Sequence, residues 1–170
     1  IEGLVSKVRE NLDESVTSPD PQAYEGWPAN VPIPDYGSTG PADFTLEVEA
    51  HRDGSLLTIV TANRQGVMAE LAGAIALAGL EIRSARTVTL GDAAVSLLEV
   101  SRADVDATWL RERLRPALAG EIDLASRLEL KPNPDGAGSR VRLLDQVFQT
   151  ATLLEVRAHD RRGLVWTVCH

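Results

Sequence analysis

The sequence has little of what several large protein classes require. Its 170 residues include one cysteine, Cys169, so no disulfide forms within the chain, which excludes a disulfide-rich secreted domain and favours the reducing cytoplasm. The chain has 17 basic residues, of which only two are lysine, and 25 acidic residues. The resulting net charge of −8 disfavours nucleic acid as a partner. No apolar run approaches the roughly 20 residues of a membrane-spanning helix. A phosphate-binding glycine loop and a nucleophile-elbow serine motif are also missing, so neither enzyme class is indicated.

Composition divides the chain into four parts. Residues 1–16 carry apolar side chains at helical spacing and predict an amphipathic helix. Residues 17–43 hold six of the nine prolines and predict an extended linker, because proline removes backbone donors and stops helices. Patterned sequence then predicts one domain over 44–149 and the start of a second over 150–170. Since the second domain is cut short, we expect the chain to be an interior part of a longer protein.

The pattern from residue 44 predicts alternating strands and helices. A hairpin is predicted around Asp53-Gly54, followed by a helix at 67–78, strands at 81–90 and 93–101, a helix at 104–119 and a strand at 141–149. From residue 56 the order is β-α-β-β-α-β. This order predicts an α+β, ferredoxin-like fold, in which an antiparallel sheet carries two helices on one face.

The helix predicted at 67–78 is apolar on both sides. One side would face the core, and the other carries Met68, Ala69, Ala72 and Ala76. A helix that is apolar all round is normally covered on both sides. We therefore expect a second copy of the chain to pack against the outer face, so that the protein self-associates.

A short internal repeat is the most informative feature. Residues 56–67 read LLTIVTANRQGV, and residues 153–164, which begin 97 positions later, read LLEVRAHDRRGL. Both leucines, the arginine and the glycine are shared, and the other positions include close substitutions. A strand, a tight loop and a helix start are thus predicted twice.

These residues resemble the ACT domain, an amino-acid-sensing regulatory module. The stretch from Val141 to Gln146, leading into the second repeat, is similar to the C-terminal region of the bifunctional uridylyltransferase/uridylyl-removing enzymes, which modify the PII nitrogen-regulatory protein. The family usually has Asp-Arg-Pro-Gly in the loop, whereas this chain has Gln65 and Arg162 in place of proline and Asn63 in place of the acid.

The resemblance implies a regulatory region with no catalytic residues of its own and glutamine as its ligand. It also implies that the parent enzyme transfers and removes nucleotidyl groups on PII with magnesium, while the chain itself needs no cofactor or metal. Two alternatives stay open. The chain is an ACT module of another amino-acid-metabolic enzyme or regulator, or it is a structural pairing domain whose ligand loop has decayed.

The candidate ligand site consists of the two repeated loops. Each loop leads from a strand into a helix start, whose free N–H groups attract a carboxylate, while Asn63 or Asp160 would meet an ammonium group. The alternative is that Asn63 and Asp160 only cap their helices. Arginines in such loops are more often solvated. The candidate residues are Asn63, Arg64, Gln65, Gly66, Asp160, Arg161, Arg162 and Gly163.

Other motifs are weaker. His159-Asp160 and Cys169-His170 lack further metal ligands nearby in the sequence, so no metal site is predicted. An acylphosphatase interpretation of Gln65-Gly66-Val67 fails, because Glu70 would repel phosphate where that motif needs arginine. Asp104 and Asp106 are interpreted as helix caps rather than as a catalytic pair, and Trp109 and Trp166 as core residues.

Overall fold

The computed structural model describes residues 43–128, 140–144, 153–158 and 161–170. The predicted N-terminal helix (1–16), nearly all of the predicted linker (17–43) and residues 145–149 of the last predicted strand lie outside the described residues. The described chain forms two units: residues 43–128 with 161–170, and residues 140–144 with 153–158. Each unit is described by itself below.

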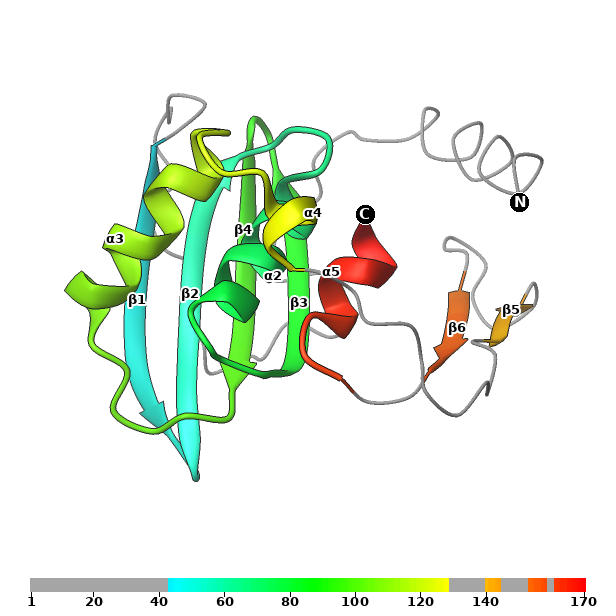
Figure 1. The fold of residues 1–170 in the computed structure, drawn as a ribbon, viewed down its shortest axis with the longest axis horizontal. Coiled ribbons are helices and arrows are strands. Elements are labelled where there is room, and N and C mark those ends of the chain that lie inside the picture. The colour runs from blue at the N-terminus through cyan, green and yellow to red at the C-terminus, as the bar shows by residue number, and fades with distance from the viewer. Residues whose placement is uncertain (1–42, 129–139, 145–152, 159–160) are drawn as a thin grey trace. The chain divides into compact units, whose positions relative to one another are not determined.

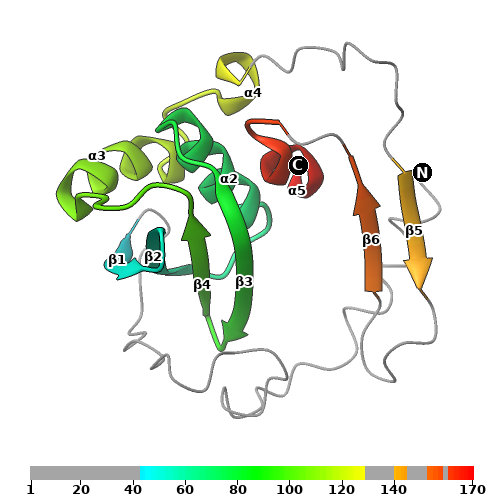
Figure 2. The same ribbon diagram turned by 90° about the horizontal axis from the view of Figure 1, so that it is seen from below.

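The larger unit is built on a four-stranded antiparallel sheet (Figure 1). Its strands lie in the order β1-β2-β4-β3. They are β1 (Phe44–His51), β2 (Gly54–Ala62), β3 (Ile82–Leu90) and β4 (Ala93–Val100). The long helices are α2 (Val67–Leu77) and α3 (Ala107–Leu118), and Figure 2 shows both on the same side of the sheet. The predicted α+β class, with an antiparallel sheet and two helices on one face, is confirmed.

The sheet contains the split βαβ unit of ferredoxin-like folds. β4 lies between β2 and β3 and is antiparallel to both. The predicted hairpin around Asp53-Gly54 is confirmed, since β1 pairs with β2. The described part of the strand predicted at 141–149 is not in this sheet and pairs with a later strand, residues 153–157. A loop of two residues, Arg52 and Asp53, joins β1 to β2, and closing such a short loop costs little chain entropy. The hairpin therefore occupies the edge position that the later strand would need.

The main core lies between the sheet and the two long helices. Alternate residues of the strands face the helices, including Leu46, Leu57, Ile59 and Leu98, and all four are buried. The helices contribute residues at helical spacing, namely Val67, Leu71, Ala74 and Ile75 from α2 and Leu110, Leu114, Ala117 and Leu118 from α3. Burial of each large aliphatic side chain contributes roughly 1.5–3 kcal/mol.

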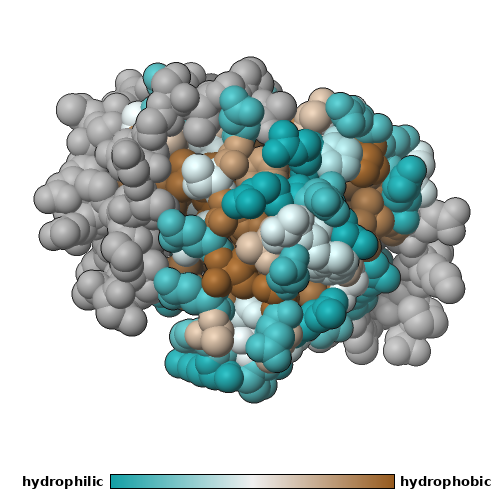
Figure 3. Space-filling view, turned by 90° about the vertical axis from the view of Figure 1, so that its left-hand side faces the viewer, coloured by the Kyte–Doolittle hydropathy of each residue, from teal (hydrophilic) through white to brown (hydrophobic). Residues whose placement is uncertain are grey.

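The two faces of the sheet carry separate apolar clusters. Val60, Val88, Leu90, Ala93 and Val95 alternate with the core residues and form a smaller buried cluster of their own. Along the side where β1 forms the edge, apolar and polar residues are interspersed (Figure 3). Of the apolar side chains of β1, Leu46 is buried, whereas Phe44 and Val48 are partly buried.

Helix α3 begins with the cap that the sequence predicts. The Asp106 carboxylate accepts a hydrogen bond from the Trp109 N–H at 2.6 Å, which satisfies a free donor of the first turn. Trp109 is only half-buried, and the guanidinium groups of Arg102 and Arg113 lie 5.3 and 4.2 Å from its ring centre. Asp106 is thus a helix cap, as predicted, whereas Asp104 lies before the helix with a φ of 55°.

The second unit is a hairpin. β5 (Arg140–Leu144) pairs antiparallel with β6 (Leu153–Arg157), with Val141 opposite Val156. Both of these valines are exposed. Across both units, none of the helices that the structure describes is long and apolar enough to cross a membrane.

Candidate functional site: a cleft at the start of helix α2

The first repeated loop, Asn63 to Gly66, connects β2 to α2. The Asn63 N–H donates to the Asp92 carbonyl at 2.7 Å, which ties the loop to the turn between β3 and β4. Gly66 is the residue before the helix, and its φ of 83° is in the left-handed region that favours glycine. No side chain caps α2. The interpretation of Asn63 as a helix cap is therefore wrong, since the cap position belongs to a glycine.

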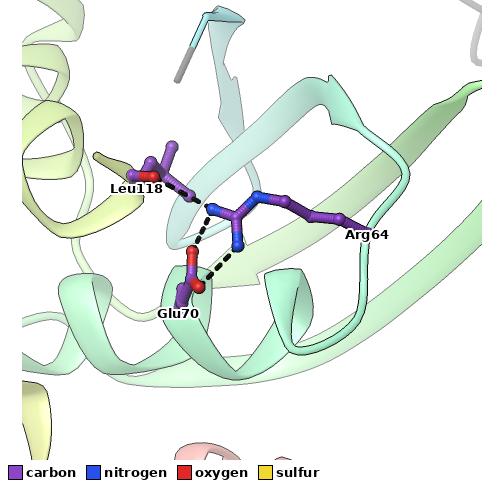
Figure 4. A network of polar contacts seen from close by, with 3 residues as sticks. All are labelled: Arg64, Glu70 and Leu118. Carbon is purple, nitrogen blue, oxygen red and sulfur yellow. Dashed lines mark hydrogen bonds and ion pairs between the residues drawn. The ribbon is translucent and has the colours of Figure 1, made fainter. Parts of the chain in front are cut away.

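Arg64 ties the loop to both long helices (Figure 4). Its guanidinium makes a two-pronged ion pair with Glu70 on α2, with one N–H···O distance of 2.6 Å, and donates to the Leu118 carbonyl at 2.9 Å. The hydrogen bond to Glu70 raises the pKa of Arg64, so the group stays charged. Arg64 is therefore not the solvated loop arginine that the sequence suggested.

The second repeated loop has the same backbone at its helix start. Gly163, with a φ of 77°, precedes helix α5 (Leu164–Cys169). The N–H of the fourth residue after each glycine donates to the glycine carbonyl at 3.0 Å, from Glu70 in the first repeat and Thr167 in the second. The predicted repeat of a loop and a helix start is confirmed. Asp160 lies outside the described residues.

Arg162 binds the far end of α2. Its Nε donates to the Ala76 carbonyl at 2.7 Å and its Nη2 to the Leu77 carbonyl at 3.2 Å. These carbonyls end the helix, where the positive charge suits the negative end of the helix dipole, and the Ala76 carbonyl also accepts from the Gly79 N–H at 3.0 Å. Arg161 precedes it and is half-buried. The described part of the second loop thus lies at the end of α2, whereas the first loop lies at its start.

Helix α5 covers the outer face of α2. Trp166 is only 4% exposed and packs against Ala69 and Ala72. Gly73 leaves the space for this ring, because a Cβ there would lie 2.8 Å from the Trp166 Cδ1 atom. The prediction that α2 is covered on both sides is confirmed, and so is Trp166 as a core residue. For Ala69 and Ala72 the cover comes from the same chain and not from a second copy, and self-association stays a prediction.

A cleft of about 370 Å³ opens where α2, α5 and the segment after α3 meet. Its wall on α2 includes Gln65 and Gly66 of the first loop. A second wall comes from the end of α3 and the short helix α4 (Leu124–Arg127), and a third from α5. The lining residues are Gln65, Gly66, Ala69 and Glu70; Ala117, Gly120, Ile122, Asp123, Leu124 and Ala125; and Trp166, Cys169 and His170.

The polar groups of the cleft differ in charge from place to place. The start of α2 presents the positive end of the helix dipole beside a glycine that has no side chain. Asp123 accepts hydrogen bonds from the Ser126 hydroxyl and from its N–H, and these lower the pKa of the Asp123 carboxyl, so it is ionised at neutral pH. The Glu70 carboxylate also lines the cleft at the helix start, but Arg64 neutralises it, so the cleft offers a positive pole at this start and a negative pole at Asp123.

The α5 wall is aromatic and sulfur-containing. The Trp166 and His170 rings stack with centres 4.8 Å apart. Cys169 is exposed, and partial desolvation by its neighbours raises the pKa of its thiol. Among the residues that the structure describes, no three histidine, cysteine, aspartate or glutamate side chains are grouped to hold a metal ion. These groups suit a small molecule that has both charged and apolar parts.

The structure brings together only part of the predicted site. Gln65 and Gly66 line the cleft, but Asn63 and Arg64 do not, and Arg162 and Gly163 lie at the other end of α2. Asp123, Trp166 and the other residues of the second and third walls were not predicted as site residues. The repeat could have indicated Trp166, because it lies three positions after the repeated glycine, Gly163. No sequence pattern indicated Asp123.

Comparison with known proteins finds a relative of this chain. The chain is 28% identical over 146 residues to the bifunctional uridylyltransferase/uridylyl-removing enzyme of Rhodospirillum rubrum. The match covers 75% of this chain but 16% of the relative. No protein-family model matches the chain, and no solved structure does. The chain is thus related to a bifunctional uridylyltransferase/uridylyl-removing enzyme, of which it spans a small part.

Proposed function

We propose that this chain is the ACT-type regulatory region of a cytoplasmic enzyme that adds and removes uridylyl groups, and that glutamine is its ligand. The relative from R. rubrum and the repeated loop and helix start support this proposal. Modification of the PII protein and a need for magnesium belong to the whole enzyme in this proposal. They rest on the family resemblance and not on any residue of the chain.

The observation that carries the ligand-binding proposal is the cleft at the start of α2. Its volume of about 370 Å³ lies near the lower limit of the roughly 300–1,000 Å³ range of small-molecule sites, which suits a ligand as small as an amino acid. In this proposal the ligand carboxylate meets the N–H groups of the first turn of α2. Gly66 lets it approach closely, because no Cβ stands in the way.

The ammonium group has a different partner from the one that the sequence suggested. Asn63 does not line the cleft, whereas Asp123 does, and the carboxylate of Asp123 is ionised. We therefore assign the ammonium to Asp123. The apolar part of the ligand side chain would lie against Trp166 and Leu124, which line the same cleft.

Calorimetry with glutamine on the whole chain tests this assignment. Gly66→Ala should abolish most of the binding heat, because a methyl group would stand at the carboxylate position. Gly79→Ala is the matched control, since Gly79 has a similar φ of 80°, and at both glycines a Cβ would meet nothing within 4 Å. Both variants carry the same backbone strain, but only Gly66 lines the cleft.

Two further measurements complete the test. Asp123→Asn should weaken binding of an amino acid more than binding of its N-acetyl derivative, because only the free amino acid carries an ammonium group. Equal binding heats for the Gly66 and Gly79 variants would contradict the proposed site. A panel of the standard amino acids would show whether glutamine or another amino acid is preferred, and so whether a different ACT-regulated enzyme is the parent.

A structural pairing domain is the second candidate, and two observations favour it. Arg64 is held by Glu70 and the Leu118 carbonyl, and Arg162 by the last carbonyls of α2. Arg64 and Arg162 are thus used to hold helices together. If no amino acid gives binding heat while α5 stays packed on α2, this second function is the better description.

A further inference from the structure

The four-stranded sheet is buried on both of its faces, although the described helices lie on one. α2 and α3 lie on the same side of the sheet, and α4 and α5 contact α2 (Figure 2). None of the helices that the structure describes lies on the opposite face. The apolar residues of that face are nevertheless buried, and we call them the outer cluster: Val60, Val88, Leu90, Ala93 and Val95.

The side chains of the outer cluster are too little exposed for an open sheet face. On such a face, neighbouring side chains surround each residue at its flanks, but its tip points away from the sheet. Val60 and Val95 are 0% exposed, and Leu90 is 2% exposed although it lies on the edge strand β3. The tips of these side chains therefore need a cover that the described helices do not supply.

The burial of this face is centred on one end of the sheet. At the far end the paired residues Leu56 and Glu99 are half-buried, whereas the paired Val60 and Val95, farther along the same two strands, are fully buried. The edge strand shows the same trend, because Arg86 is exposed while the later residues of β3 on this face are buried. The cover thus lies over one end of the sheet and not over the whole face.

The chain enters the sheet at this same end. Phe44, the first residue of β1, pairs with Thr61, and Thr61 is adjacent to Val60 of the outer cluster. Three strand spacings, about 14 Å, separate β1 from β3. An extended segment of about five residues spans that distance at roughly 3.1 Å per residue. Residues 17–42, which precede β1, are therefore long enough to cross the outer cluster.

The composition of residues 17–42 suits a segment that packs on an apolar surface. They include both tyrosines of the chain, Tyr24 and Tyr36, and one of its three tryptophans, Trp27. Val31 and Ile33 add aliphatic surface. The prolines of this segment have no N–H to leave unpaired and a fixed φ, so ordering the segment across side chains costs less free energy.

We propose that residues 17–42 pack across the outer cluster, with Trp27 as the main anchor because its ring buries the most apolar surface. Residues 129–139, which follow the last helix of the segment after α3, carry one large apolar side chain, Leu130, and suit this role less. The segment before β1 is then part of the domain and not a free connection. The proposal is independent of glutamine binding, because the outer cluster lies on the sheet face opposite α2 and its cleft.

Nuclear magnetic resonance of the whole chain, with labelled valine methyl groups, tests this contact. We expect nuclear Overhauser cross-peaks between the Trp27 ring and the methyl groups of Val60 and Val95. Trp27→Ala should remove these cross-peaks and shift the methyl signals of both valines. A soluble paramagnetic agent should then broaden these signals toward the level of Val168, which is 51% exposed in the unchanged chain.

Trp109→Ala is the matched control, because it makes the same change on α3, on the other side of the sheet. It should leave the signals of Val60 and Val95 unchanged. The proposal is overturned if the Trp27 ring gives no cross-peak to the outer cluster, or if Trp27→Ala leaves both valines protected. Cross-peaks to these valines from residues 1–16 instead of Trp27, or from a second copy in a sample of mixed labelling, would identify another cover and also overturn it.

Discussion

The two repeats start their helices in the same way but hold them differently. Both α2 and α5 follow a glycine in the left-handed region, and both show the same first backbone hydrogen bond. α2 then lies between the sheet and α5 with eight of its residues buried, whereas Trp166 is the only buried residue of α5, and Arg162 just before it bonds to the end of α2. The comparison teaches that a short repeat specifies a backbone start, while burial decides how stable the helix is.

The largest expected effect is on the well-buried helix. Leu71→Ala removes a fully buried side chain from the core of α2 and should lower the free energy of unfolding by about 3 kcal/mol. Val168→Ala in α5 is the contrasting control, because Val168 is 51% exposed, and it should change stability little. Chemical denaturation measures both. Equal effects would mean that the two helices do not differ in burial as described.

Trp166→Ala should act mainly on α5. Loss of the ring should release this helix and lower the free energy of unfolding by about 2 kcal/mol, less than a core truncation, because opening is local. It should also uncover Ala69 and Ala72, so association should increase with concentration. Light scattering beside denaturation tests both points. A strictly monomeric variant would argue against self-association through this face of α2.

Gly66 and Gly163, which precede α2 and α5, allow the two helix starts to be compared directly. Alanine at either position must adopt a positive φ, which costs about 1 kcal/mol. Gly66→Ala should therefore lower the global stability by about that amount. Gly163→Ala should chiefly loosen α5, seen as faster hydrogen exchange of the α5 amides with a nearly unchanged unfolding midpoint. The reverse pattern would show that α5 is the firmer element.

Arg64→Ala tests how the first loop is held. The pair with Glu70 is about 29% and 28% exposed, so solvent screens it, and its loss should cost about 1 kcal/mol. Glu70→Gln should cost less, because the amide oxygen still accepts a hydrogen bond from Arg64. Denaturation curves of the two variants give the order. If Arg64→Ala has no effect, the loop does not depend on this contact.

The smallest effect is a pH dependence at Asp123. Hydrogen bonds from Ser126 lower its pKa below the ordinary 3.8, so the folded protein favours the charged carboxylate. The stabilisation is therefore present above that ordinary value and disappears as the pH falls through the lowered pKa. A chemical-shift titration of the Asp123 carboxyl carbon measures it. Ser126→Ala should bring the midpoint back toward the ordinary value.

Much of the first repeat could be predicted from its pattern. The apolar spacing of 67–78 and the alternation of the strands determine which residues face the core, because the periods of helix and strand differ. The turn at Asp53-Gly54 also predicted β1 beside β2, and the short loop favours this pairing because its closure costs little chain entropy. The pattern did not predict that residues 141–144 would pair with β6 instead of joining this sheet.

The candidate site shows the same division. Loop composition pointed to Gln65 and Gly66, and both line the cleft. It also pointed to Asn63 and Arg64, whose groups instead contact the Asp92 carbonyl, Glu70 and the Leu118 carbonyl. Glu70 is a local partner on the next helix, but only the packing of distant elements places the Asp92 and Leu118 carbonyls beside the loop.

The sequence by itself thus determined the local events: where strands alternate, where helices begin at Gly66 and Gly163, and which face of α2 is apolar. These follow from backbone sterics and from the spacing of apolar residues. The tertiary structure alone decided what covers that face and what completes the cleft. Trp166 lies 93 positions after Gly73, and no local rule relates a ring to a missing Cβ across such a separation. That match depends on close packing, which acts on neighbours in space and not along the chain.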